Sequence, residues 1–368
     1  FWMWLSALFG MVTKFSEVTL AVKYRERNEK GDWCGGPMYY IKNGLGPKWK
    51  WLGGVFAVLG AIAAFGIGNI AQVHSIADSV KSVAVAFNEN AASKETMICL
   101  ITGICVAAFV ALVLLGGVKR IGQVTEKLVP GMAIIYIVCA LIVVFANIGS
   151  VPGVFASIFK GAFNPAAVTG GAAGMSIKLA MTKGVGRGVF SNEAGLGSAA
   201  IAHAAADTDG PVHQGVFGIF EVFVDTIVIC SLTALTIICS GVEIPFGVKP
   251  GSELIMQAFA TVFGARFASL FVAFALMLFA FSTIVGWYFF GEQNVKYLFG
   301  TRGVTPYRMV VMCFIVMGSL LQVNLVWELA DMFNGLMAFP NLIALIGLAK
   351  VVSKALDEFE QANLADNK

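Results

Sequence analysis

The sequence predicts an all-α polytopic membrane protein. Hydrophobic residues make up 58% of the 368 residues and charged residues 13%, whereas soluble domains carry about 25% charged residues. A helix needs about 20 mostly apolar residues to cross a bilayer, and roughly nine stretches of the chain meet that requirement. The predicted spans are 1–23, 52–80, 96–116, 130–148, 170–206, 214–240, 266–298, 307–323 and 326–352.

The first predicted span begins at Phe1 with FWMWLSALFGM, and neither an initiator Met nor a charged flank precedes it. We therefore expect an N-terminally truncated chain. A signal peptide is the alternative, but the basic region that opens a signal peptide is missing. No long linker divides the sequence, so we expect one transmembrane domain over 1–352 and a polar cytoplasmic tail over 353–368.

The basic residues predict the orientation in the membrane. Lys and Arg concentrate in 23–50, 119–127 and 296–308 and at Lys350 and Lys354, and cytoplasmic loops retain an excess of positive charge. This predicts a multi-pass protein of the inner or plasma membrane with a cytoplasmic C-terminus. The net charge of +3 is explained by these loops and indicates no nucleic-acid partner.

Two helices are predicted to lie at the membrane surface instead of crossing it. One falls within the turn-rich, aromatic segment 31–51, and the other within 251–263, which is too short and too polar to cross. The seven cysteines show no metal-ligand spacing. Because a Walker A sequence, a Cys or His cluster and a nucleophile with a paired base are also missing, we predict no catalytic residue and no organic cofactor.

The segment GVGRGVFSNEAGLGSA (184–199) places charged residues and five glycines at membrane depth. Each glycine weakens a helix by about 1 kcal/mol, and irregular backbone is tolerated there only in a protein interior or a water-filled cavity. This predicts a discontinuous helix near 188–195, whose exposed ends favour a cation and an anion. The alternative is that the glycines only allow close helix packing.

Paired ionisable residues occur in two other spans. Glu221 and Asp225 are spaced i, i+4 and are expected on one helix face, where they could bind an ion or carry protons, or, as we favour, brace the broken helix by hydrogen bonds. Lys14 and Glu17 are expected to pair with each other. In the ninth span, Asp331 precedes a proline, which predicts a kinked helix that acts in gating.

Two spans carry polar residues that could contact a ligand. Gln72 follows two glycines, and the local G-x-G-x-x-A pattern is only a weak dinucleotide match because it lies in mid-membrane. Ser282 and Thr283 offer hydroxyl oxygens to a monovalent cation, and Trp287 could form one wall of a small pocket. The alternative for the two hydroxyls is hydrogen bonding to the preceding helical turn.

The whole chain resembles the alanine/glycine:cation (sodium) symporter family of prokaryotic transporters. The motif GVGRGVFSNEAGLGSAAIAHAAADTDGPVHQG (184–215) carries the similarity most specifically, with further similarity in GGPMYYIKNGLG, FGIGNIAQ and FSTIVGWYFFGE. The resemblance implies a LeuT-type fold, which is an inverted-repeat bundle of ten core helices. The predicted spans are one short of ten, and the member lacking would be the other broken helix.

The resemblance also implies a function and a set of site residues. The implied activity is import of small neutral amino acids (alanine, glycine) coupled to sodium by alternating access, with the lipid bilayer as surroundings. Proton coupling, or a non-transporting receptor or channel on the same fold, are the alternatives. The implied substrate-binding residues are Gln72, Phe190, Ser191, Asn192, Ala194 and Trp287; sodium-binding residues are Ser282 and Thr283; structural or gating residues are Arg187, Glu193, Glu221 and Asp225.

Overall fold

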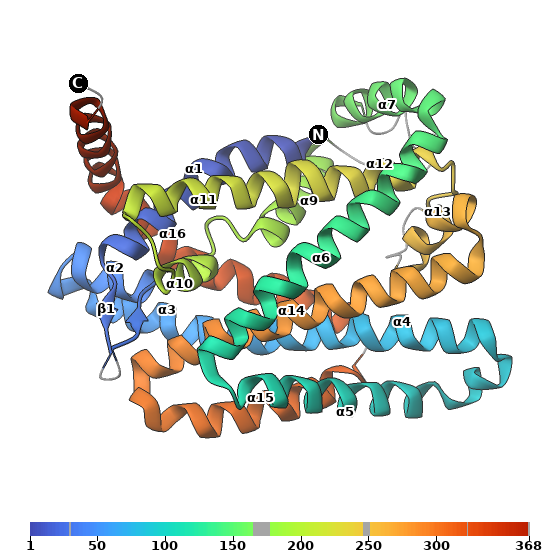
Figure 1. Ribbon diagram of the computed structural model, residues 1–368, viewed down its shortest axis with the longest axis horizontal. Coiled ribbons are helices and arrows are strands. Elements are labelled where there is room, and N and C mark those ends of the chain that lie inside the picture. Colours follow the sequence, from blue (N-terminus) through green and yellow to red (C-terminus); the bar gives the residue numbers. More distant parts are fainter. Residues whose placement is uncertain (29–30, 165–176, 246–250, 322, 367–368) are drawn as a thin grey trace.

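The protein is a bundle of long helices with one small hairpin (Figure 1). The computed structural model describes residues 1–28, 31–164, 177–245, 251–321 and 323–366. The α-helices are α1 (Trp2–Lys23), α2 (Pro37–Gly44), α3 (Lys50–Ala63), α4 (Ala71–Phe87), α5 (Glu95–Leu114), α6 (Gly117–Ala146), α7 (Val151–Phe163), α9 (Ile177–Asn192), α10 (Ser198–Ala204), α11 (Pro211–Val222), α12 (Ser231–Cys239), α13 (Glu253–Phe263), α14 (Ala265–Phe299), α15 (Val304–Gly318) and α16 (Val323–Asp366). Short 3₁₀ turns are η1 (Pro47–Trp49), η3 (Glu89–Lys94), η4 (Ile148–Ser150) and η6 (Gly300–Gly303).

Seven helical stretches within the described residues are long and apolar enough to cross a membrane. They are Trp2–Lys23, Pro47–Phe87, Asn90–Leu114, Arg120–Ala146, Pro211–Cys239, Ala265–Gly318 and Asp331–Ala365. The sixth stretch contains α14 and α15, so two predicted spans fall within it. The predicted span 170–206 is not among the seven, because its described part is divided into the short helices α9 and α10.

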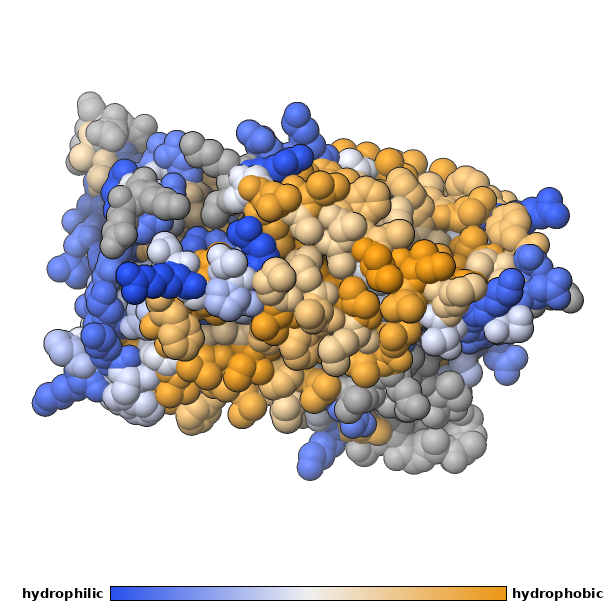
Figure 2. All heavy atoms as spheres, turned by 90° about the horizontal axis from the view of Figure 1, so that it is seen from below, coloured by the Kyte–Doolittle hydropathy of each residue, from blue (hydrophilic) through white to orange (hydrophobic). Residues whose placement is uncertain are grey.

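On the face drawn in Figure 2, an apolar band lies between two hydrophilic ends. One end gathers the hairpin, α2, the α5–α6 and α14–α15 turns and the C-terminus (Figure 1), which are the segments rich in Lys and Arg. The hairpin pairs β1 (Glu26–Arg27) with antiparallel β2 (Trp33–Cys34). The guanidinium groups of Arg25 and Arg27 lie 4.1 and 4.3 Å from the Trp33 ring centroid. We call this end of the molecule the basic end.

The helix packing forms two cores. α1 packs along α9 and α11, and α14 packs along α3 and α4. The larger core joins α3, α4, α14, α15 and α16 with the buried sides of α2 and α10. A smaller core joins α6, α12, α13 and the first half of α14. The surface helices predicted in 31–51 and 251–263 are confirmed as helices, namely α2 and α13.

Two long helices contain a wider, π-helical turn. η2 (Ala64–Ile70) joins α3 to α4, and η5 (Phe223–Cys230) joins α11 to α12. A π-turn carries one extra residue and disturbs the regular ladder of hydrogen bonds, and it is frequent at functional sites. In η2 the Asn69 amide donates to the carbonyl of Ala64 at 2.5 Å. Neither π-helical segment was predicted from the sequence.

Candidate functional site

The predicted discontinuous helix is present, and its interruption spans residues 193–197, between α9 and α10. Three of these residues have positive φ: Glu193 at 55°, Gly195 at 91° and Gly197 at 82°. Glycine adopts such angles without strain, whereas a non-glycine residue such as Glu193 is uncommon there. The break therefore lies a few residues further along than expected, and the first residues of the predicted half-helix 170–189 lie outside the described residues.

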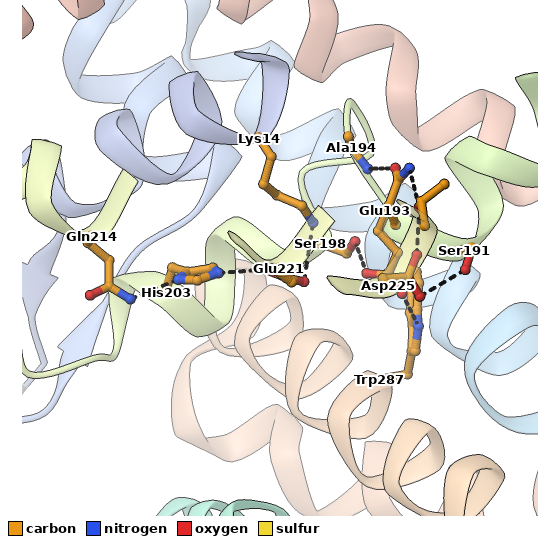
Figure 3. A network of polar contacts seen from close by, with 12 residues as sticks. Lys14, Ser191, Glu193, Ala194, Ser198, His203, Gln214, Glu221, Asp225 and Trp287 are labelled. Atoms are coloured by element: carbon orange, nitrogen blue, oxygen red, sulfur yellow. Dashed lines mark hydrogen bonds and ion pairs between the residues drawn. The ribbon is translucent and has the colours of Figure 1, made fainter. Parts of the chain in front are cut away.

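The Glu193 side chain joins the break to α10 and α14. One carboxylate oxygen accepts a hydrogen bond from the Trp287 indole at 2.8 Å, and the other accepts one from Ser198 at 2.5 Å (Figure 3). Trp287 is 2% exposed, and its Cβ lies directly against Gly68 of η2. The strained carboxylate residue is thus held from two sides.

The end of α9 is bound to η5. Ser191 donates to Asp225 Oδ1 at 2.9 Å, and Asn192 Nδ2 donates to Thr226 Oγ1 at 3.0 Å. Thr226 in turn donates to Asp225 Oδ2 at 2.8 Å. The backbone N–H of Ala194 donates to Asn192 Oδ1 at 3.0 Å. These bonds cross-link the first half of the broken helix to the π-turn.

A third set of contacts connects the break to α1, α2 and α16. Asn341 of α16 donates to Glu17 of α1 at 2.5 Å and to the Gly195 carbonyl at 2.9 Å, and its own side-chain oxygen accepts a hydrogen bond from Tyr40 of α2. Burial, and to a smaller extent the negative charge of Glu17, raise the pKa of Tyr40 well above its ordinary value, so the phenol keeps the proton that it donates. Asn341 thereby joins α1, α2 and α16 to the broken helix.

Buried Lys14 forms an ion pair with the partly exposed Glu221, which corrects the expected pairing of Lys14 with Glu17. Lys14 Nζ lies 3.5 Å from Glu221 Oε1, and the Lys14 side chain is fully buried. His203 lies 2.8 Å from the other Glu221 oxygen, and Gln214 lies 2.8 Å from His203 Nδ1 (Figure 3). Because η5 begins two residues after Glu221, Glu221 and Asp225 face different partners although their spacing predicted a shared face.

Arg187 and Phe190 of α9 lie beside α16. Arg187 forms an ion pair with Asp331 of α16 at 3.2 Å and lies over the Phe190 ring, 5.3 Å from its centroid. The three residues line a cavity of about 360 Å³ between α9 and α16, together with Leu196 and Asn334. The cavity thus reaches the break itself.

The remaining predicted residues make hydrogen bonds within their own helices. Gln72 donates to the carbonyl of Ile67 at 3.2 Å, across the end of η2. Ser282 and Thr283 both donate to the carbonyl of Phe279, at 2.8 and 3.0 Å. Each hydroxyl keeps acceptor lone pairs after donating, so this arrangement leaves oxygen ligands for a cation. Within the part of the chain that the structure describes, none of the three side chains is hydrogen-bonded to the break.

Sequence comparison assigns the chain to a known family. Residues 1–368 match the sodium:alanine symporter family along their whole length. The chain belongs to the sodium:alanine symporter family. The family is one of transporters, so the protein is not an enzyme, and membership supports sodium-coupled transport of an amino acid.

Individual relatives agree with the family assignment. The chain is 43% identical to an uncharacterized transporter of Haemophilus influenzae, over 98% of this chain and 76% of the relative. It is 42% identical to the sodium/alanine symporter AgcS of Methanococcus maripaludis, over 98% and 78%. It is 40% identical to the probable sodium/glutamine symporter GlnT of Bacillus subtilis, over 99% and 72%. The chain therefore spans about three quarters of the length of these symporter-family relatives.

Proposed function

We propose that the protein imports small neutral amino acids, alanine and glycine among them, together with sodium by alternating access. The observation that carries the proposal is the interruption 193–197, where a broken helix brings polar groups together beside a cavity. Broken helices of this kind form substrate and ion sites near the bilayer midplane of secondary transporters.

The substrate is proposed to bind beside the break, in contact with residues that come from three helices. Phe190 and Trp287 would supply aromatic rings that select for small side chains, and Ser191 and Asn192 would supply polar groups at the end of α9. Gln72 and Ala194 complete the proposed lining. A substrate that competes for Ser191 and Asn192 would have to exchange their present bonds to η5, which links binding to a movement of that segment.

Sodium is proposed to bind the hydroxyl oxygens of Ser282 and Thr283, which follow each other on α14. They lie about one turn before Trp287, because a helical turn takes about 3.6 residues. An ion there would affect the position of the indole that contacts Glu193. The proposed coupling between sodium and substrate thus runs along one helix.

Gating is proposed to involve the Arg187–Asp331 ion pair, which joins α9 to α16 beside the cavity. Both side chains are about half exposed, at 43% and 52%, so the pair can open at a small cost because exposed ion pairs contribute only about 0 to 1 kcal/mol. Opening would separate the broken helix from α16.

The basic end is proposed to face the cytoplasm of the inner or plasma membrane, which places the C-terminus inside. The gathering of Lys-rich and Arg-rich loops at one end of the bundle supports this orientation (Figure 1). A fluorescent protein that folds only in the cytoplasm, fused after residue 368, should fluoresce. If cells that express the full-length fusion protein do not fluoresce, the opposite orientation is the correct one.

Uptake by the full-length protein in proteoliposomes tests the function. We expect labelled alanine to accumulate when a sodium gradient is directed inward, and to stop when choline replaces sodium. Asn192→Ala should lower uptake at limiting alanine at least about tenfold, which corresponds to about 1.4 kcal/mol of lost binding. Uptake that is driven by a pH gradient in the absence of sodium would show that the coupling ion is the proton and not sodium. Alanine binding without accumulation under either gradient would reject transport in favour of a receptor.

A further inference from the structure

A second cavity lies at the basic end, far along the chain from the break and not used by the proposed transport mechanism. It has a volume of about 710 Å³ and lies between α2, α3 and the end of α14. Its main lining residues are Glu26, Tyr39, Lys42, Lys50, Trp51 and Lys296. The cavity therefore combines three ammonium groups with aromatic rings.

The charges of this cavity are only partly compensated. Lys42 pairs with Glu26 at 2.8 Å, and Lys296 pairs with Glu292 at 2.6 Å. Lys50 is exposed and forms no ion pair with any residue that the structure describes. The three lysines of the cavity are neutralised by only two glutamates, so the cavity keeps a net charge of one positive unit, on Lys50.

An adjoining recess of about 740 Å³ increases that excess. It shares Tyr39 and Lys296 with the first cavity and adds Arg27 and Arg302. The combined surface therefore carries a surplus of positive charge. It also holds a polar atom that could meet a ligand, because the Tyr297 hydroxyl is buried and has no hydrogen-bond partner among the described residues.

An apolar stripe on α3 leads away from the cavity. Trp51, Val55, Val58 and Ile62 are 63%, 39%, 45% and 37% exposed. Their spacing of four, three and four residues keeps them on one helix face. From Trp51 to Ile62 the helix rises about 16 Å, at about 1.5 Å per residue. This is about half of the roughly 30 Å hydrocarbon core, so the stripe is as long as one leaflet is thick.

We propose that this cavity binds the phosphate headgroup of an anionic phospholipid, with an acyl chain along the α3 stripe. Basic pockets between membrane helices hold anionic headgroups by the attraction of lysine and arginine to phosphate. Trp51 sits at the junction of headgroup and acyl chain, which is the position that tryptophan favours at membrane interfaces. A soluble phosphate would use the lysines but not the stripe, so the continuity of cavity and stripe assigns a lipid.

Lipid binding to the purified full-length protein in detergent tests the proposal, with native mass spectrometry as the readout. Dioleoyl phosphatidylglycerol should be retained at least about tenfold more tightly than dioleoyl phosphatidylcholine, in line with the contribution of each basic residue near a charged headgroup. Lys50→Gln should weaken phosphatidylglycerol binding about fivefold, and Lys42→Gln with Lys50→Gln about twenty-five-fold. The matched control is Lys354→Gln on exposed α16, which removes the same charge from the same end.

The two parts of the site are tested separately. Dihexanoyl phosphatidylglycerol, whose chains cannot reach Ile62, should bind at least about tenfold more weakly than the dioleoyl lipid, because about 0.8 kcal/mol is lost for each CH₂ that is no longer buried. Equal retention of phosphatidylcholine, or equal losses for Lys354→Gln and Lys50→Gln, would overturn the proposal. Displacement of the lipid by millimolar inorganic phosphate would assign the cavity to a soluble anion instead. The readout is lipid retention, so it is independent of alanine uptake.

Discussion

The contact between Gly68 and Trp287 predicts that a single methyl group will disable the protein. A Cβ added at Gly68 would lie 2.2 Å from Trp287 Cβ and 2.6 Å from its Cγ. Ordinary contacts begin at 3.4 Å, so the two helices must separate by about 3.4 − 2.2 = 1.2 Å. No rotamer of Trp287 relieves this contact, because its Cβ is fixed by the α14 backbone.

The separation acts on the break through one hydrogen bond. Trp287 donates to Glu193 at 2.8 Å, and a shift of about 1.2 Å takes the pair beyond hydrogen-bonding distance. Overpacking costs about 1 to 3 kcal/mol. If Gly68→Ala raises the free energy of the transport-competent arrangement by about 2 kcal/mol, the population of that arrangement falls about thirtyfold, and the uptake rate falls with it.

Alanine uptake and thermal unfolding of the full-length protein measure this effect. Gly286→Ala is the matched control, because it adds the same methyl group beside Trp287 on the same helix with no atom within 4 Å. The control should keep its uptake and unfold at an equal or higher temperature, since alanine favours helix over glycine. If Gly68→Ala transports alanine as fast as Gly286→Ala, the close approach of η2 to α14 does not exist in the transporting protein.

Three further experiments test other contacts of the site. Glu221→Gln leaves the ammonium of Lys14 buried without a counter-charge and should lower the free energy of unfolding by about 3 kcal/mol. This is the low end of the range for breaking a buried pair, because the Glu221 side chain is 43% exposed. Adding Lys14→Met should restore the free energy of unfolding, and a double variant that stays destabilised would refute the pairing. Ser282→Ala with Thr283→Ala should raise the sodium concentration for half-maximal uptake at least about tenfold without changing the melting temperature, and an unchanged sodium dependence would remove both residues from the ion site. Asn341→Asp places a second carboxylate beside Glu17 and should reduce uptake more than Asn341→Ala does, so the opposite order would show that the two side chains are not in contact.

The broken helix could be predicted from the sequence because its signals are local. Five glycines and a glutamate at membrane depth already exclude a regular helix over 184–199. The position of the break was harder to predict, because the first residue with a positive φ is Glu193 and not a glycine. Two hydrogen bonds hold Glu193 in that conformation, one from the hydroxyl of nearby Ser198 and one from the indole of Trp287, which is far along the chain. A tertiary contact of this kind leaves no local pattern.

The partners of the buried charges could not be predicted for a related reason. Lys14 and Glu17 have helical i, i+3 spacing, which suggested a local pair, but Lys14 meets Glu221 of α11 and Glu17 meets Asn341 of α16. The π-turn η5 likewise directs Asp225 away from the face of Glu221. Spacing along one helix predicts a shared face only while the helix is regular.

The contacts around residues 193–197 suggest why binding and gating would occur at one place. Polar groups at the break reach three separate elements: Asn192 reaches η5, Glu193 reaches α14, and the Gly195 carbonyl reaches Asn341 of α16. Asn341 extends the connection to Glu17 of α1. Because buried polar groups are costly to leave unpaired, the half-helices cannot move relative to these elements unless something replaces the bonds. Under the proposed function, the ammonium group of the amino acid and the sodium ion would replace the partners of the Glu193 carboxylate and the Gly195 carbonyl, and the substrate carboxylate would accept from Asn192. The proposed ligands would then also be the groups able to release the break.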